Sequence, residues 1–251
     1  MSPARLIILA CVFFFTSLIS VVTGSTSLLT VPAMIALGIE AHVAVATNML
    51  ALIFMSAGGS LPFLRSGTVD RRYLPLSILL TVVGSILGAL FLLETSARSL
   101  QLVVGIAMIF VASLMLWRRD EASGRTKEVA RGTVVAGYLA TFLLAIYGGF
   151  FSGGYVTLLT VAFIAFFGMT FHQGVATTKV VNVFSSAVAT AVFLWRGLVD
   201  VRLGIVLGLV MFFGAILGSR VALRLNAIWL RRVFLVAVFA LAAKMLLAAV
   251  N

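Results

Sequence analysis

Residues 24–89 of this chain align without a gap with residues 154–219, 130 positions later, and 24 of the 66 aligned positions are identical. An apolar chain aligns many leucines by chance, but the identities here extend to polar residues and glycines: Gly24/Gly154, Gly38/Gly168, His42/His172, Thr47/Thr177, Gly67/Gly197, Asp70/Asp200 and Arg72/Arg202. The chain is therefore a duplicated unit, and it must fold into an architecture that accepts the same unit twice.

The composition indicates an integral membrane protein. Hydrophobic residues make up 63% and charged residues 10% of the 251 residues, and the mean hydropathy is +1.23. Apolar stretches between charge clusters approach the roughly 20 residues that cross a bilayer as a helix. The sequence therefore predicts an all-α, polytopic fold. In membrane proteins, internal duplication is typical of transporters that place a substrate site between two repeats.

The net charge of +11 does not indicate a nucleic-acid partner. The arginines stand in short connections between apolar spans, where they set orientation and contact anionic headgroups, so the lipid bilayer is the expected large partner. A single cysteine, Cys11, excludes an intrachain disulfide and a cysteine-rich metal site. We expect neither a metal nor a cofactor.

Charges and glycines divide the chain into two units. The first unit is residues 1–117 and the second is residues 132–251, and between them lies a polar linker, 118–131, that is predicted to be cytoplasmic. The predicted apolar segments are 5–22, 27–38, 43–63, 73–93 and 99–117 in the first unit, and 132–149, 154–168, 173–194, 203–222 and 230–249 in the second.

Each unit opens with an interrupted apolar stretch. As one helix, residues 132–168 would be about 55 Å long, against a hydrocarbon core of about 30 Å. Gly148, Gly149, Gly153 and Gly154 interrupt this stretch, as Gly24-Ser25-Thr26-Ser27 interrupts the first unit. We therefore expect a hairpin of two short helices that meet at a glycine-rich turn within the membrane, where the backbone is buried in protein or lines a cavity.

The distribution of arginines predicts that the two units are inverted. Three arginines between Arg65 and Arg72 mark one loop as cytoplasmic. The equivalent loop at 196–202 falls on the outside once the loop at 220–232, with four arginines, is also cytoplasmic. Each unit is then a membrane hairpin followed by three transmembrane helices.

Two polar motifs recur in both units and supply the candidate substrate-binding residues. At the glycine-rich breaks, unwound backbone and helix N-termini offer N–H groups that suit an anion; these residues are Gly24, Ser25, Thr26, Gly153 and Gly154. The span that follows begins with the side chains of Thr47, Asn48, Thr177, Thr178, Lys179 and Asn182. If they face the hairpin of their own unit, their donors converge with its N–H groups. The four-residue spacings Gly84/Gly88 and Gly214/Gly218 instead predict close helix packing.

Lys179 is the most specific candidate, since few charges stand so far inside a predicted span. Ionisable residues there are costly and usually face a cavity. The alternative is that its side chain extends to the interface, because Lys179 lies only about two turns into its helix. For Lys244, near the C-terminus, extension to the interface is the expected role.

His42 and His172 occupy equivalent positions just before these motifs. Histidine titrates near neutral pH, so either side chain is a candidate proton relay. The alternative, which we favour, is a residue at a helix entry that bonds a loop carbonyl.

The order and spacing of these motifs resemble the sulfite exporter TauE/SafE family, also called the toluene sulfonate uptake permease family. The resemblance covers nearly the whole chain and rests on Leu29-Thr30-Val31-Pro32, Gly38, the Gly-x-Val-Asp loops at 67–70 and 197–200, and Ala176-Thr177-Thr178-Lys179 with Asn182. The first turn has one glycine where the family has several, and Ala162 takes the place equivalent to Pro32. The resemblance implies movement of small sulfur-containing anions, such as sulfite or organosulfonates, across the inner membrane of the cell.

Three other interpretations are weaker. A transporter of another small anion, of the carboxylate type, fits the same residues. An intramembrane serine hydrolase with Ser152 and His172 would lack the Gly-x-Ser-x-Gly elbow, so we predict no catalytic residues and no enzyme activity. A membrane assembly factor would need no buried lysine. No motif specifies the substrate, the direction of transport, the coupling ion or the oligomeric state, and a homo-oligomer stays among the alternatives.

Overall fold

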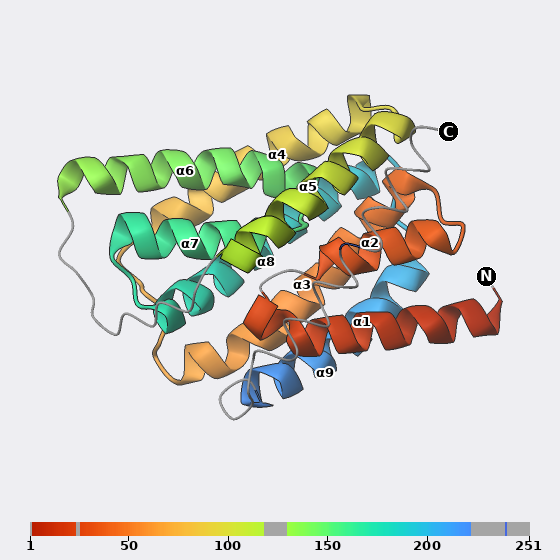
Figure 1. Cartoon of the computed structure of the whole chain (residues 1–251), viewed down its shortest axis with the longest axis horizontal. Coiled ribbons are helices and arrows are strands. Elements are labelled where there is room, and N and C mark those ends of the chain that lie inside the picture. The colour runs from red at the N-terminus through yellow and green to blue at the C-terminus, as the bar shows by residue number, and fades with distance from the viewer. Residues whose placement is uncertain (1, 24–25, 118–129, 222–238, 240–251) are drawn as a thin grey trace.

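The computed structural model describes residues 2–23, 26–117, 130–221 and 239, which form helices joined by short connections (Figure 1). The described helices are α1 (Pro3–Thr23), α2 (Ser27–Ala36), α3 (Ala41–Arg65), α4 (Leu74–Glu94), α5 (Ala97–Trp117), α6 (Arg131–Phe150), α7 (Tyr155–Phe167), α8 (Phe171–Trp195) and α9 (Val201–Val221). Six of them, α1, α3, α4, α6, α8 and α9, are long and apolar enough to cross a membrane. The predicted all-α, multi-pass fold is confirmed. The predicted span 230–249 and the linker at 118–129 lie outside the described residues, and the proposed unit boundaries stay a prediction.

The duplication in the sequence reappears in the structure. α3 and α8 begin and end at equivalent residues, 130 positions apart. The turns before them contain Gly38 and Gly168, with φ of 91° and 67°, and the turns after them contain Gly67 and Gly197, both with φ of 69°. Because this left-handed region favours glycine, the repeated glycines give both units the same turns. In Figure 1, α3 and α8 run in opposite directions, as do α4 and α9. An inverted repeat requires this arrangement, and the membrane side of each loop stays a prediction.

The two helices that open each unit are separated where the sequence predicts, but the first of them is longer than predicted. α6 ends at Phe150 and α7 begins at Tyr155, and the residues between them are all buried. The prediction of two short helices was wrong for the first of each pair, since α1 and α6 have 21 and 20 residues whereas α2 and α7 have 10 and 13. The reason is the place of the break, which comes about 20 residues after the start of each apolar stretch and leaves room for a span-length helix.

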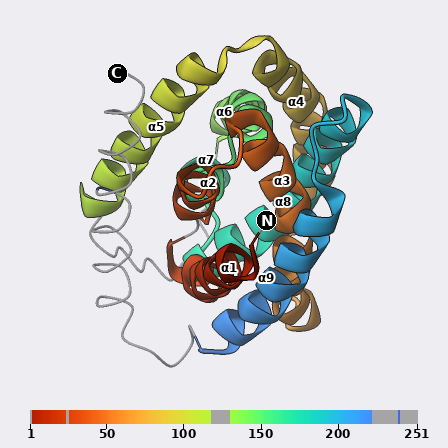
Figure 2. The same cartoon turned by 90° about the vertical axis from the view of Figure 1, so that its right-hand side faces the viewer.

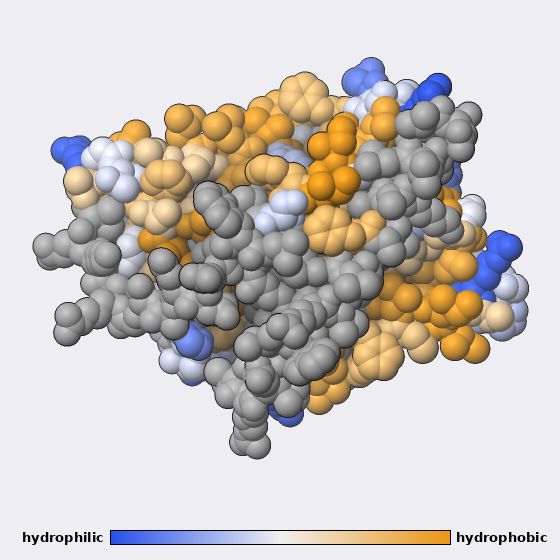
Figure 3. Space-filling view, viewed as in Figure 1, coloured by the Kyte–Doolittle hydropathy of each residue, from blue (hydrophilic) through white to orange (hydrophobic). Residues whose placement is uncertain are grey.

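α2 and α7 lie in the interior of the bundle, as Figure 2 shows from one end. Seven of the ten residues of α2 are buried. The helices α3, α4, α8 and α9 form a wall along one side of this pair. The outward surface is apolar, and Figure 3 shows orange hydrophobic side chains over most of the visible described surface, with blue hydrophilic ones at the ends. A lipid-exposed exterior has this pattern because the bilayer core is as apolar as leucine.

Glycines let two helices of this wall pack closely against the first helices of the hairpins: α4 against α6, and α9 against α1. Gly84 and Gly88 of α4 face α6, and Gly214 and Gly218 of α9 face α1. A Cβ at any of the four would lie less than 3.0 Å from an atom of the facing helix. The predicted packing role of these glycines is therefore confirmed, and each of the two equivalent seams joins a helix of one unit to the first helix of the other.

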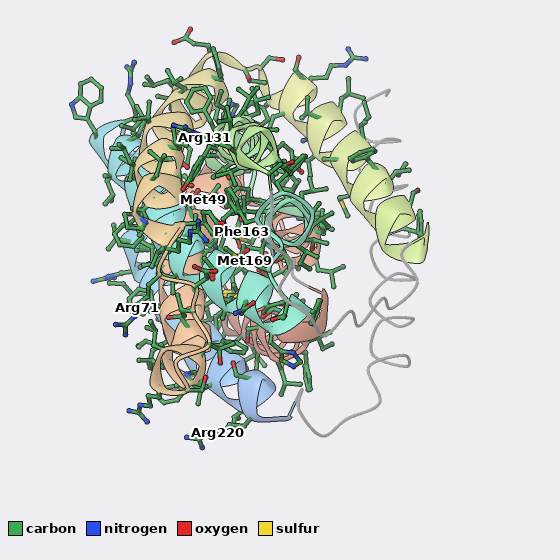
Figure 4. All side chains as sticks on the ribbon, turned by 90° about the vertical axis from the view of Figure 1, so that its left-hand side faces the viewer. Met49, Arg71, Arg131, Phe163, Met169 and Arg220 are labelled. Carbon is green, nitrogen blue, oxygen red and sulfur yellow. The ribbon has the colours of Figure 1, made fainter. Side chains whose placement is uncertain are left out.

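Five arginines lie at one end of the bundle, where α3 and α9 end and α6 begins: Arg65, Arg71, Arg72, Arg131 and Arg220. Figure 4 looks onto this end and shows Arg71 and Arg220 pointing outward, while Met49 and Phe163 lie inside. Among the described residues this end holds one acid, Asp70, whereas at the opposite end the arginines are accompanied by three, Glu40, Glu94 and Asp200. The end with five arginines is therefore the one we expect in the cytoplasm.

The glycine seams give a first prediction. Gly88→Ala should destabilise the protein by about 1–3 kcal/mol, because the new methyl group meets the backbone of α6 and one of the two helices must move. Gly132→Ala is the matched control, since a Cβ there meets open space. Thermal unfolding in detergent should show a clearly lower Tm for the first variant alone. Equal Tm values would contradict the seam.

The predicted inversion of the two units gives a second prediction. Ser66 and Arg196 are equivalent and both exposed, and they stand at opposite ends of the bundle. In a background in which Cys11 is replaced by alanine, an impermeant thiol reagent should label Arg196→Cys in intact cells and should label Ser66→Cys only after permeabilisation. If both cysteines, or neither, react in intact cells, the units are not inverted across the membrane.

Candidate functional site

A row of buried polar side chains runs along α8 through the middle of the bundle. The start of α8 is set by a capping box, in which the Thr170 side chain accepts from the Gln173 N–H and the Gln173 side chain accepts from the Thr170 N–H. From that fixed start, residues three and four positions apart fall on one face of the helix. The row consists of side chains that are at most 3% exposed: Thr178, Lys179, Asn182, Ser185, Ser186 and Thr190.

The equivalent helix of the first unit, α3, has buried polar residues at three of these six positions, Asn48, Ser56 and Ser60, and apolar residues at the other three. Lys179, Asn182 and Ser185 correspond to Met49, Leu52 and Met55, which are also buried. The two units therefore share a backbone, but only the second presents a charge and an amide at these three positions. The polar site is an asymmetric feature of a symmetric fold.

Lys179 is fully buried, and its side chain does not extend to an interface. Its aliphatic part passes Gly59 of α3, where a Cβ would lie 3.6 Å from the Lys179 Cδ. Its Nζ lies 3.4 Å from the Oγ of Ser20, three residues before the end of α1. Lys179 therefore points away from its own unit and toward the first, at the junction of α1, α3 and α8.

No carboxylate of the described residues neutralises Lys179. The ion pair between His42 and Glu40 lies at a helix entry, away from Lys179. The acids of the described ranges stand at helix ends or in connections: Glu40, Asp70, Glu94 and Asp200. Because an isolated charge is costly in an apolar interior, an ammonium here is a strong attractor for an anion.

Asn182, one turn further along α8, also reaches the first unit. Its Nδ2 donates to the Oγ of Ser56 on α3 at 2.6 Å. Its Oδ1 has no partner among the described residues, nor do the hydroxyls of Ser186 and Thr190 on the same helix. Buried polar atoms without partners mark places where water or a polar ligand binds.

Thr47 and Thr177, predicted as substrate-binding residues, hold the connections of the opposite unit. The Oγ1 of Thr177 accepts from the Asp70 N–H, and the Oγ1 of Thr47 accepts from the Asp200 N–H, both at 3.0 Å. The two bonds are equivalent under the repeat and lie at opposite ends of the bundle. We refer to them as the cross-unit bonds.

Asn48 and Thr178 join the short interior helices to the wall. Asn48 accepts from the Thr30 hydroxyl at 2.7 Å and donates to the Ser27 Oγ at 2.9 Å, which ties α2 to α3. The Thr178 Oγ1 accepts from the Thr160 hydroxyl at 3.3 Å, which ties α7 to α8. These two residues face the hairpin of their own unit, as the sequence suggested, whereas Lys179 and Asn182 face the other unit.

The glycine-rich break of the second unit is closely packed. A Cβ on Gly153 would meet the Phe151 ring. The Gly153 carbonyl accepts a hydrogen bond from the Tyr147 hydroxyl. Gly154 has φ of 86° and caps the start of α7. In the first unit, Thr26 is buried and its hydroxyl lies 3.5 Å from the Met55 sulfur. Gly24 and Ser25 lie outside the described residues, and an anion-binding role for either break stays a prediction.

The two histidines lie away from this junction. His42 contacts Glu40 through Nδ1 at 2.8 Å and donates from Nε2 to the Thr95 carbonyl at 2.7 Å, at a helix entry. Burial raises the pKa of Glu40, but the hydrogen bonds from His42 and the Val43 N–H outweigh it and hold that pKa below its usual range. His172 is exposed and packs edge-on against Phe171. A proton relay through either histidine stays a prediction.

Sequence reasoning missed Ser20 and Ser56, the hydroxyls beside Lys179 and Asn182. Ser56 had a usable signal, since Ser56 and Ser186 are identical across the repeat. Ser20 had none, because it stands within an apolar helix and its equivalent is Phe150.

Comparison with known proteins is consistent with this architecture. The model of the family described as "Sulfite exporter TauE/SafE" matches residues 9–245. A "Probable membrane transporter protein" of Haemophilus influenzae is 26% identical over 245 residues, which cover 96% of this chain and 94% of the relative. "Probable membrane transporter protein ORF9" of Sinorhizobium sp is 29% identical over an alignment that covers 93% of this chain and 89% of the relative. "Probable membrane transporter protein YfcA" of Escherichia coli K12 is 28% identical over an alignment that covers 98% of this chain and 91% of the relative. No solved structure matches the chain.

The cross-unit bonds give a third prediction. Thr47→Val and Thr177→Val each keep nearly the same side-chain shape but remove the hydroxyl acceptor and leave a backbone N–H unpaired. Each should therefore lower the free energy of unfolding by about 1–3 kcal/mol. Because the two bonds are equivalent, the losses in Tm should be similar. Thr141→Val is the control, since the Thr141 hydroxyl bonds only the Gly137 carbonyl of its own helix. A loss from one of the two variants alone would show that the bonds are not equivalent.

Proposed function

This chain belongs to the sulfite exporter TauE/SafE family and is a multi-pass membrane transporter, and we propose that its cargo is a small anion bound beside Lys179. The observation that carries the proposal is the fully buried Lys179 without a carboxylate partner among the described residues. We further propose that the anion is sulfite or an organosulfonate and that the membrane is the inner membrane of the cell.

The chemistry of the junction favours an oxyanion. The Lys179 ammonium supplies the positive charge, and the hydroxyls of Ser20 and Ser56 and the amide of Asn182 supply neutral polar groups on three different helices. A sulfonate or sulfite group presents three oxygens, so it can accept from several of these groups at once. Hydrogen bonds to a charged group contribute roughly 1.5–3 kcal/mol, more than those between neutral groups.

The site lies between the two units, since α1 and α3 come from the first and α8 from the second. Transporters built from repeats use such an interface, because movement of one unit against the other exposes the site to either side. The cross-unit bonds at both ends of the bundle are among the contacts that such a movement would have to change.

The proposal predicts that Lys179→Met weakens anion binding about ten- to a hundredfold, the loss of one charged hydrogen bond in a low-dielectric site. Methionine should fit, because the equivalent position in the first unit is the buried Met49. The measurement is uptake of labelled methanesulfonate, sulfite, acetate and sulfate into proteoliposomes, with binding followed by thermal stabilisation in detergent.

Lys244→Met is the matched control, since it makes the same chemical change in a segment outside the described residues, where the sequence predicts a lysine that extends to the interface. Sulfonate and sulfite should be taken up by the wild type and by the control. Wild-type affinity and flux in Lys179→Met would place the anion site elsewhere. Preferred uptake of acetate would show that the substrate is a carboxylate and not a sulfur oxyanion.

A further inference from the structure

Lys179 also bears on what drives transport, and we propose that it takes up a proton together with the anion, so that each cycle moves one proton and one monovalent anion and no net charge. The inference rests on the proposed function, because it assigns the coupling ion of the same site.

The first step is that nothing described can balance a permanent ammonium when the site is empty. The sequence has seven acidic residues, of which four lie at helix ends or in connections of the described chain. The other three, Asp120, Glu121 and Glu128, belong to the linker between the units, and residues 24–25 and 222–251 contain no aspartate or glutamate. A side-chain carboxylate for Lys179 is therefore absent from the described bundle and from the sequence of both those segments.

The second step concerns the other titratable groups of the helices that contact α8. On α6 and α7 they are tyrosines, the half-buried Tyr138 and Tyr147 on α6 and the buried Tyr155 on α7, and tyrosine is neutral at physiological pH. The remaining ones stand near helix ends, in a connection or facing outward: Arg5 and Cys11 on α1, His42 and Arg65 on α3, Asp70 in the connection that bonds Thr177, Tyr73 and Glu94 at α4, Arg131 on α6, His172 on α8 itself, and Arg202 and Arg220 on α9. No second charged group of the described chain reaches the junction, so the charge there is set by Lys179 and its ligand.

The third step is a balance of charge. A lone ammonium and a lone anion are each costly in this interior, whereas the pair is neutral and hydrogen-bonded. The empty site is therefore most stable with the neutral amine. Binding adds a proton from the aqueous side to the amine nitrogen and places the anion beside the resulting ammonium. Release on the other side reverses both events, and the empty amine returns without carrying charge.

A single ammonium also fixes the charge of the cargo. One monovalent anion, a sulfonate or sulfite in its hydrogensulfite form, makes the loaded site neutral, whereas a dianion such as sulfate leaves one uncompensated negative charge in the bundle. The expected order of transport is methanesulfonate well above sulfate, which shares the oxyanion chemistry and differs in charge.

The experiment uses the full-length wild-type protein in proteoliposomes and methanesulfonate as the probe, because this anion stays ionised and cannot carry the proton itself. A pH gradient of one unit, acidic outside, should drive about tenfold accumulation at equilibrium, with one proton entering per anion. A membrane potential set with potassium and valinomycin should leave that accumulation unchanged. Accumulation that follows the potential and ignores the pH gradient would overturn the inference.

Lys179→Arg provides the matched variant, because the guanidinium stays charged at all relevant pH values. It should lose accumulation driven by the pH gradient, and retained wild-type accumulation would show that Lys179 does not carry the proton. If the variant does not fold, the ratio of protons to anions in the wild type decides alone. Uptake coupled to charge movement refutes only the proton coupling, whereas absence of uptake for every anion of the panel refutes the proposed function as well.

Discussion

The bilayer supplies no hydrogen bonds, and most of this structure follows from that constraint. Each backbone N–H and C=O within the membrane must find a partner inside the protein, which explains why the described chain is helical. The same constraint decides where the chain can leave the helix. The break between α6 and α7 is fully buried, and its unwound backbone is held by the Tyr147 hydroxyl and by close contacts at Gly153.

Close approach of helices replaces the hydrophobic effect as the main source of packing energy, because lipid is as apolar as the helices themselves. Gly84 and Gly88 let α4 approach α6, and Gly214 and Gly218 let α9 approach α1. The wall is therefore attached to one hairpin helix in each half by the same seam. The cross-unit bonds add a polar tie at each end of the bundle, so both ends are held in the same way in this structure.

The helices, the turns and the glycine seams of this fold could be predicted from the sequence, for a physical reason. Repeated glycines with positive φ, glycine seams and span-length apolar runs are local features, so the sequence indicates them directly. The partners across the bundle are not local. Thr47 and Asn48 are adjacent and look alike as hydroxyl and amide donors, yet Thr47 bonds a connection of the other unit and Asn48 bonds its own hairpin. Adjacent residues on a helix point about 100° apart, so only the packing decides which neighbour each one meets.

The asymmetry between the units connects this architecture to function. A symmetric site with Lys at both position 49 and position 179 would hold two ammonium groups in one interior, and a site with Met at both would hold none. The chain has one of each, Met49 and Lys179, on equivalent turns of α3 and α8. Duplication supplies two halves with the same backbone, and divergence at three buried positions of one helix supplies a single lysine between them. Because α1 and α3 of the first unit supply Ser20 and Ser56, the charge of one unit is surrounded by groups of the other, and any relative movement of the units changes the surroundings of Lys179.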